Sequence, residues 1–160
     1  MSLDSIISFE YVNIKVKDHL VLSDVNLTVN KSEFVYIIGK VGSGKTSLIK
    51  TMNAEYPLDE GFVTVSGFQL KNIKRKDIPK LRRKLGIVFQ DFQLLTDRSI
   101  HKNLEFILKA TGWKNKAEIN DRIVEVMEKV NLGYKGFMMP NQVSGGEQQR
   151  VAICRALVND

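Results

Sequence analysis

A glycine-rich stretch between a predicted strand and a predicted helix places the strongest constraint on how this chain can fold. Its residues fit the pattern G-x-x-x-x-G-K-[ST] of a phosphate-binding P-loop, and they are Gly39, Lys40, Val41, Gly42, Ser43, Gly44, Lys45 and Thr46. The largely apolar residues 33–38 before it are typical of a short buried strand, and residues 47–52 after it, beginning at Ser47, favour a helix. Because the motif requires a strand, a glycine-rich turn and a helix in this order, the sequence predicts a P-loop core.

The residue types of this stretch suit a polyanionic phosphate. Gly39, Gly42 and Gly44 permit backbone conformations closed to other residues, so that successive N–H groups can turn toward one ligand. The N-terminus of the following helix adds a partial positive charge. We therefore predict that the stretch binds a nucleotide, with Lys45 reaching the β- and γ-phosphates and the Thr46 hydroxyl ligating Mg²⁺.

Length and composition are those of one ordinary globular domain. The chain has 160 residues, of which 43% are hydrophobic and 26% are charged. Its longest wholly apolar run, residues 34–38, is far shorter than a membrane span, and its first residues lack the basic start and apolar core of a signal peptide. A single cysteine, Cys154, excludes an internal disulfide and suits a reducing cytoplasm.

Much of the net charge of +6 lies in one segment. Residues 71–84 hold eight basic side chains against one acidic side chain, Asp77. We interpret the segment as a solvated helix face, with the anionic cytoplasmic surface of a membrane as the alternative. It has neither interleaved aromatic residues nor a nucleic-acid-binding motif, so we expect no nucleic acid as a partner.

Alternation of apolar and polar residues predicts several strands. An antiparallel meander is expected over residues 6–29, in which Tyr11 faces the core together with its neighbour two positions earlier. A further strand is expected over residues 62–65. Residues 85–89 predict a buried strand that ends at Gln90.

Helical periodicity dominates the second half of the chain. It predicts amphipathic helices over residues 99–111, with Ser99 as the N-cap, and over residues 116–131. A short helix carrying Pro79 in its first turn precedes them, and a last helix begins at Ser144. Strands followed by helices indicate an α/β P-loop core with an inserted helical subdomain.

The start of the last helix holds a second informative segment. Residues 143–150, hereafter the signature segment, read Val-Ser-Gly-Gly-Glu-Gln-Gln-Arg. Ser144 and Glu147 form the capping-box pattern S-x-x-E, but this pattern does not explain Gly145 and Gly146, each of which costs a helix about 1 kcal/mol relative to alanine. Glycines are useful there if a ligand approaches the helix N-terminus, which indicates a second anion-binding helix end.

Together these motifs resemble those of the ABC ATPase family. Its signature is Leu-Ser-Gly-Gly-Gln followed by Gln-Gln-Arg, which this chain matches with Val143 for Leu and Glu147 for Gln, and the glutamine of its Q-loop matches Gln90. The resemblance implies one partial ABC-type domain over residues 1–160. Within it we expect an antiparallel β subdomain (6–35), the P-loop core to the Q-loop (36–90), a helical subdomain (91–143) and the signature helix (144–160).

The resemblance also implies a shared ATP site. When full length, two copies are expected to form a head-to-tail homodimer that depends on ATP, with each ATP, and Mg²⁺ as its second cofactor, between the P-loop of one copy and the signature segment of the other. The trans contacts would come from Ser144, Gly145, Gly146 and Glu147. Gln90 would lie near Mg²⁺ and the attacking water. The family stacks adenine on an aromatic residue where this chain has Val16, so we expect weaker base stacking.

A finer resemblance lies in residues 89–103, which are similar to the cell-division type of bacterial ABC ATPase. It implies an ATP hydrolase that is cytoplasmic, peripheral on the inner face of the cell membrane, and paired with a polytopic membrane protein subunit. The lipoprotein-releasing and macrolide-exporting types are alternatives within the family. A non-catalytic ATP-dependent interaction module is another alternative, and a DNA-repair ATPase is disfavoured because there is no room for a long coiled coil.

The family continues with a Walker B strand carrying the carboxylates that support Mg²⁺ and polarise water, and this sequence ends before that segment. We therefore expect a fragment that by itself binds nucleotide poorly and hydrolyses it hardly at all. The same strand lies beside the P-loop strand in the family, so an open apolar strand edge is expected here.

Overall fold

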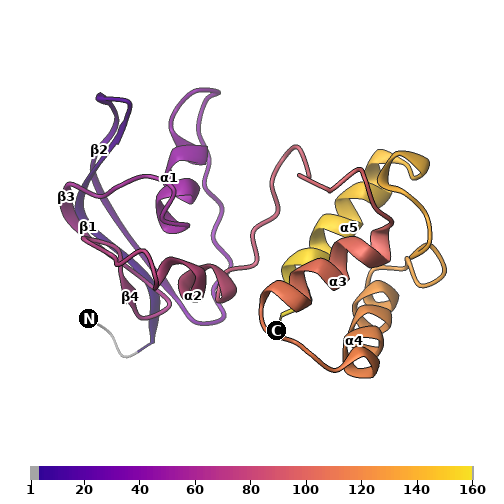
Figure 1. Cartoon of the computed structure of the whole chain (residues 1–160). Helices are drawn as coiled ribbons and strands as arrows, with labels where there is room; N and C mark the ends of the chain where they lie inside the picture. Colours follow the sequence, from indigo (N-terminus) through magenta and orange to yellow (C-terminus); the bar gives the residue numbers. More distant parts are fainter. Residues whose placement is uncertain (1–3, 160) are drawn as a thin grey trace. The chain divides into compact units, whose positions relative to one another are not determined.

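The computed structural model describes residues 4–159 and divides into two compact units, Met1–Lys84 and Leu85–Asp160 (Figure 1). The first unit is built on an antiparallel sheet and the second on helices. Within the described part, no helix has the length and apolar character needed to cross a membrane. The expected absence of a signal peptide concerns the first residues, of which 1–3 lie outside the described part.

The sheet of the first unit has the strand order β2-β1-β3-β4, and all its pairs are antiparallel. Its strands are β1 (Ser5–Val16), β2 (His19–Asn30), β3 (Glu60–Val65) and β4 (Phe68–Gln69). Lys17 and Asp18 connect β1 to β2 with φ angles of 48° and 65°, which suit a two-residue hairpin turn. The structure confirms the predicted meander and the strand at residues 62–65, and adds the short strand β4.

Tyr11 interrupts the alternation of β1. The register of β1 shifts between Phe9 and Val12, and Tyr11 adopts a φ of 52°. Phe9 and Val12 are therefore both buried while Tyr11 is 73% exposed, so the prediction that Tyr11 faces the core is wrong. An inserted residue reverses a period-of-two pattern. Gly61 on β3 fits this irregularity, because a Cβ there would lie 2.4 Å from the Tyr11 carbonyl oxygen.

Two helices complete the first unit. The helix α1 (Lys45–Met52) lies against β1 and buries Leu48 and Met52. The helix α2 (Ile78–Arg83) carries Pro79 in its first turn, as predicted. Arg82 Nε of α2 donates to the Asn53 carbonyl oxygen at 3.1 Å and so attaches α2 to the end of α1. The other buried apolar side chains of this unit are Phe9, Val12, Ile14, Leu58, Val63, Val65, Leu70 and Leu81.

The segment before the phosphate loop differs from its prediction. Residues 33–40 form no strand, and Phe34, Tyr36 and Ile38 are 82%, 80% and 89% exposed. The predicted buried strand is therefore wrong, and so is the open strand edge expected with it, because the segment is not a strand and its apolar side chains are exposed. A strand forms only against a neighbour that completes its backbone hydrogen bonds, and no strand of the described residues pairs with this segment.

Three α-helices and a short 3₁₀ helix make up the second unit. They are α3 (Ile100–Ala110), α4 (Lys116–Lys129), η1 (Pro140–Gln142) and α5 (Gly145–Leu157). Ser99 caps α3 by accepting from Lys102 N, as predicted, and Asn115 caps α4. The apolar faces of these helices meet in one core that includes Ile100, Leu104, Leu108, Ile119, Ile123, Val126, Met127, Leu132, Val143, Val151, Cys154 and Val158.

Residues 85–89 lie outside regular secondary structure, so the predicted strand there is also wrong. Val88 is 42% exposed. A Cβ on Gly86 would come within 2.9 Å of the Ala156 carbonyl oxygen, which places this segment along the end of α5. None of the described strands pairs with residues 85–89, so their backbone groups have no neighbour with which to form a β-ladder.

Candidate functional site

The predicted phosphate loop, residues 39–46, leads directly into α1. Gly42 and Gly44 adopt φ angles of 81° and 89°, which favour glycine, and Gly44 is the N-cap of α1. The Ser43 N–H donates to the Lys40 carbonyl oxygen at 3.2 Å and closes the turn. At Gly39 an added Cβ would lie 2.6 Å from Ser43 Oγ. Three glycines thus permit a tight loop at a helix N-terminus.

Lys45 places its ammonium group over this loop. Its Nζ donates to the carbonyl oxygens of Gly39 and Lys40, both at 2.7 Å, and lies 3.5 Å from Ser43 Oγ. These partners within the described chain are neutral oxygens, so the positive charge remains available to an incoming anion. Thr46 in the first turn of α1 is exposed, as an incoming ligand requires.

The β1–β2 hairpin contacts the other side of the loop. A Cβ on Gly44 would lie 2.8 Å from Leu22 Cγ and 3.0 Å from Val21 Cγ1, so β2 packs directly against the N-cap of α1. Val16 ends β1, pairs with His19 and is half-buried. The structure therefore puts the predicted base-contacting residue on the hairpin that contacts the phosphate loop, and its contact with a base stays a prediction.

Gln90 lies on the second unit, exposed at the start of a loop (residues 90–99) that leads to α3. Phe92 and Gln93 adopt φ angles of 56° and 48°, so the chain turns sharply after Gln90. Arg155 of α5 donates to the Gln93 carbonyl oxygen at 2.6 Å, and burial lowers the pKa of its guanidinium. The Gln90 loop is thus attached to the helix that begins at the signature segment.

Asn103 of α3 fixes the far end of the same loop. Its side chain is buried, and its Oδ1 accepts from the Leu95 N–H at 2.8 Å. Its Nδ2 donates to the carbonyl oxygens of Leu95, Arg98 and Ser99 at 2.9, 3.2 and 3.0 Å. One buried side chain therefore satisfies four backbone groups of the loop, which accounts for the absence of regular structure there.

The signature segment forms the N-terminus of α5 and contains the predicted capping box. Ser144 Oγ accepts from the Glu147 N–H at 3.3 Å, and Glu147 Oε2 accepts from the Ser144 N–H at 2.9 Å. The first backbone bond of the helix runs from Gln148 N to Ser144 O at 2.9 Å. The N–H groups of Gly145 and Gly146 precede it and are left for another acceptor.

The space around the two signature glycines is open. A Cβ on Gly145 would meet no atom of the described chain within 4 Å, and a Cβ on Gly146 would meet only Arg150 Nη1 at 4.0 Å. Neither glycine is therefore required by packing within the chain. Packing among the described residues therefore does not account for two glycines in a helix, where alanine is more stable.

Charged side chains surround Glu147. Its Oε1 forms an ion pair with Lys135 Nζ and lies 3.8 Å from Arg150 Nη2. The hydrogen bond from Lys135, followed by that from the Ser144 N–H, lowers the pKa of Glu147 to about 2. The carboxylate is thus charged at neutral pH while a cation compensates it.

The predicted site residues fall into two groups. The first unit brings the phosphate loop and the Val16 hairpin together. The second unit holds Gln90 at the start of a loop that is attached to α5, the helix that begins at the signature segment. Sequence reasoning did not find the roles of Leu22 and Lys135. Both act through contacts between residues distant in sequence, which no local pattern reveals.

The described residues contain no group of three or more His, Cys, Asp and Glu side chains that could hold a metal ion. Magnesium bound with a nucleotide commonly takes its ligands from the phosphates, from water and from one or two protein oxygens. The exposed Thr46 hydroxyl and the exposed Gln90 amide fit such a role, because both are neutral oxygen donors on the surface.

Comparison with known proteins identifies the class. The family model described as ABC transporter matches residues 22–160, so the chain belongs to this family. Its solved relatives include the dimeric structure of MJ0796, a bacterial ABC transporter cassette, with a TM-score of 0.86, 33% identity, and coverage of 96% of this chain and 69% of that one. A second structure of MJ0796, in a post-hydrolysis state bound to ADP and Pi, gives a TM-score of 0.84 at the same identity and coverage. The predicted α/β ABC-type fold is confirmed.

Among curated proteins, the chain is similar to the cell division ATP-binding protein FtsE. It is 42% identical over 139 residues to FtsE of Streptococcus pneumoniae serotype 2 (strain D39 / NCTC 7466), covering 87% of this chain and 60% of the relative. It is 43% identical over 138 residues to FtsE of Mycobacterium tuberculosis (strain ATCC 25618 / H37Rv), covering 86% and 60%. It is also 41% identical over 140 residues to the glutamate/aspartate import protein GltL of Escherichia coli (strain K12), covering 88% and 58%. The chain thus spans about 60% of the length of these relatives.

Proposed function

We propose that this chain is the ATP-binding portion of an ABC ATPase, in which two copies enclose ATP between the phosphate loop of one and the signature segment of the other. The observation that carries the proposal is the open N-terminus of α5. Its glycines have no packing role within the described chain, yet they follow a complete phosphate loop in the order of the family. The reaction would be ATP + H₂O → ADP + phosphate.

Within this scheme Lys45 stabilises the charge on the β- and γ-phosphates. Its ammonium would exchange the carbonyl oxygens of Gly39 and Lys40 for phosphate oxygens, and the N-terminus of α1 would add the potential of its N–H groups. Lys40, Val41, Ser43 and Ser47 contribute backbone or hydroxyl groups around the same anion. Val16 would contact the base through its short aliphatic side chain.

Magnesium, when bound with ATP, would neutralise charge that develops on the phosphates. On this chain we assign Thr46 and Gln90 as its protein ligands, in keeping with their exposed neutral oxygens. Gln90 also senses the γ-phosphate and the attacking water. Arg155 and Asn103 hold the loop that follows Gln90, so a movement of Gln90 would be passed to α3 and α5.

The trans half of the site would be the helix end of α5. Gly145 and Gly146 offer two N–H groups, Ser144 offers a hydroxyl, and the dipole of the 13-residue helix adds positive potential. Glu147 closes the capping box and so holds these donors in place. A phosphate from the opposite copy would complete the hydrogen bonds that the helix itself leaves open.

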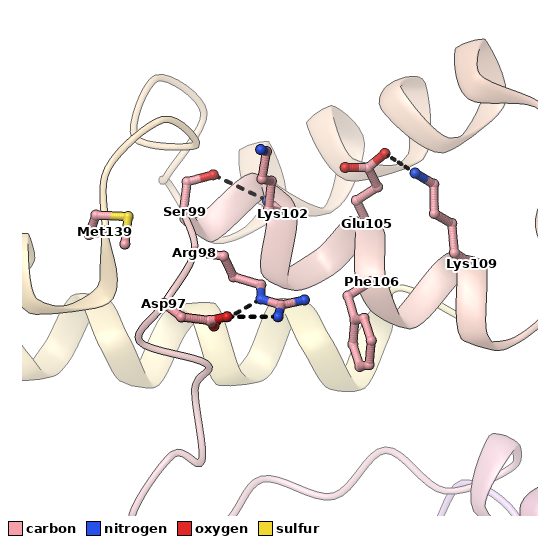
Figure 2. Close-up of a pocket in the computed structure, with 8 residues that line it drawn as sticks. All are labelled: Asp97, Arg98, Ser99, Lys102, Glu105, Phe106, Lys109 and Met139. Atoms are coloured by element: carbon pink, nitrogen blue, oxygen red, sulfur yellow. Dashed lines mark hydrogen bonds and ion pairs between the residues drawn. The ribbon is translucent and has the colours of Figure 1, made fainter.

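We further propose that the protein is of the cell-division type and acts with a polytopic membrane protein on the inner face of the cell membrane. A groove of about 610 Å³ runs along α3. Figure 2 shows the residues that line it, which are Asp97, Arg98, Ser99, Lys102, Glu105, Phe106, Lys109 and Met139. It lies at the end of the Gln90 loop and carries both signs of charge. The partner would place a short segment there, with charges of both signs and an apolar residue against Phe106.

Gly145→Ala tests the proposed function in the complete gene product. Alanine at this helical position should raise the free energy of unfolding by up to about 1 kcal/mol, because it meets no neighbour and favours the helix. The same methyl group should abolish dimerisation driven by ATP, measured by light scattering, because it occupies the space of the phosphate. Gly133→Ala is the matched control, since its Cβ would meet only Glu128 Cγ at an ordinary 3.5 Å.

Two results would count against the proposal. One is a Gly145→Ala protein that dimerises with ATP as readily as the wild type. The other is equal loss of dimerisation in the Gly145→Ala and Gly133→Ala proteins, which would show a general effect of substitution. Turnover of ATP by the wild type separates the hydrolase from a non-catalytic module that closes on ATP without hydrolysing it.

A further inference from the structure

We propose that Lys135 is a positioning residue of the signature helix, whose charge cancels that of Glu147 so that the helix end can accept a phosphate. This inference rests on the proposed function of the signature segment. It assigns a role to a residue outside every motif of the chain, on the loop between α4 and η1.

The geometry places Lys135 and Glu147 in one half-buried cluster. Their side chains are 25% and 16% exposed, and Lys135 Nζ contacts Glu147 Oε1. The other carboxylate oxygen, Oε2, accepts the Ser144 N–H at 2.9 Å. Glu147 is therefore held at the helix N-terminus by its capping role, and Lys135 occupies the oxygen that capping leaves free.

Charge explains why the site needs this lysine. A helix N-terminus carries about half a positive charge, and a carboxylate in its first turn reverses the sign of the local potential. A phosphate that approaches Gly145 and Gly146 would then meet a net negative helix end. The ammonium of Lys135 restores the positive potential while Glu147 keeps its cap.

Arg150 does not replace Lys135 in this role. Its Nη2 lies 3.8 Å from Glu147 Oε1, and its side chain is 41% exposed against 25% for Lys135. Interaction with an exposed cation is weakened by water and salt, whereas the Lys135 contact is partly shielded from both. The lowered pKa of Glu147 also favours Lys135 over Arg150 as the main partner, because the hydrogen bond from Lys135 is the largest cause of the shift.

The test is a double-mutant cycle on the complete gene product, with ATP-driven dimerisation as the readout. Lys135→Met should raise the ATP concentration for half-maximal dimerisation by about tenfold, the scale of one unpaired charge at a half-buried helix terminus. In the Glu147→Gln background the same substitution should change this concentration by less than about twofold, since no carboxylate remains to be cancelled. Lys135→Arg should retain wild-type behaviour because it keeps the cation.

Lys129→Met is the matched control. Lys129 pairs with Glu125 at 2.7 Å on the exposed face of α4, with side chains 56% and 48% exposed, and its loss should leave dimerisation unchanged. Lys135→Met could instead raise the ATP concentration for half-maximal dimerisation equally in the wild-type and Glu147→Gln backgrounds. That result would overturn the inference, because Lys135 would then act independently of the charge on Glu147. No effect in the wild-type background would overturn it as well. Failure of the wild type itself to dimerise with ATP would instead overturn the proposed function.

Discussion

Gly42 and Gly44 of the phosphate loop differ in whether an added Cβ would contact β2. We therefore predict that Gly44→Ala lowers the free energy of unfolding more than Gly42→Ala does. Both residues have similar positive φ angles, 89° and 81°. A Cβ on Gly42 would meet no atom within 4 Å, whereas a Cβ on Gly44 would lie 2.8 Å from Leu22 Cγ and 3.0 Å from Val21 Cγ1. The difference between the two variants therefore isolates the contact with β2.

The magnitudes follow from these distances. Alanine in the left-handed backbone conformation costs about 1–2 kcal/mol, and alanine restricts the unfolded chain, which offsets about 0.4–1 kcal/mol of that cost. Gly42→Ala should therefore lower the free energy of unfolding by about 1 kcal/mol. Gly44→Ala should lower the free energy of unfolding by about 1–3 kcal/mol more than Gly42→Ala, because Leu22 and Val21 must move to accommodate the methyl group, as in an overpacked core. Urea unfolding without nucleotide measures both values.

A double variant tests the stated cause. Shortening Leu22 to alanine removes the atoms nearest to the added methyl group, so Gly44→Ala should cost less in the Leu22→Ala background than in the wild type. Equal losses of stability for Gly42→Ala and Gly44→Ala would refute the claim that β2 packs against the N-cap of α1. So would a Gly44→Ala cost that is the same in both backgrounds.

Two further predictions concern the second unit. Asn103→Ala should lower the free energy of unfolding by about 2–4 kcal/mol and should speed exchange of the Leu95 amide hydrogen. The Asn103 Oδ1 accepts one hydrogen bond and the two amide hydrogens of this side chain are shared among three carbonyl oxygens, which amounts to about three bonds of about 1 kcal/mol each. The exposed Asn120→Ala should cost less than about 0.5 kcal/mol, and a similar cost for both would contradict the loop-fixing role. The folded-state pKa of Glu147, about 2, lies below its ordinary 4.5, so its contribution to stability is complete above pH 4.5 and is lost as the pH falls toward about 2. The urea midpoint of Glu147→Gln should therefore fall less over this window than that of the wild type, and parallel curves would contradict the assignment.

Local patterns predicted much of the fold. Ser99 and Ser144 act as caps where the sequence places them, and the helices begin within a residue or two of their predicted starts. The predictions at residues 33–38 and 85–89 were wrong for one reason. An apolar run indicates that a segment favours burial, but a strand also depends on a hydrogen-bonded neighbour, and local sequence does not report that neighbour.

Parts of the candidate site could be predicted where the residues involved are neighbours in the sequence. The phosphate loop and the capping box depend on residues within a few positions of one another. The helix after the loop forms with Gly44 as its N-cap, and the capping box forms as predicted, whereas the strand before the loop does not. Tyr11 shows the opposite case, since a single inserted residue in β1 reversed its orientation. The Lys135–Glu147 pair and the contact of Leu22 with Gly44 join distant segments, so they became visible only in three dimensions.

The most direct test of the shared ATP site is a mixing experiment with two inactive variants of the complete gene product. Lys45→Ala lacks the cation that we propose to bind phosphate, and Gly145→Ala carries a methyl group at the helix end that we propose to accept it. If each ATP is bound between two copies, the mixed dimer contains one site with both halves intact, and mixing should restore ATP-dependent association that neither variant shows alone. If the phosphate loop and the signature segment of one copy form the site together, no intact site exists in the mixture. A mixture as inactive as its components would contradict the account.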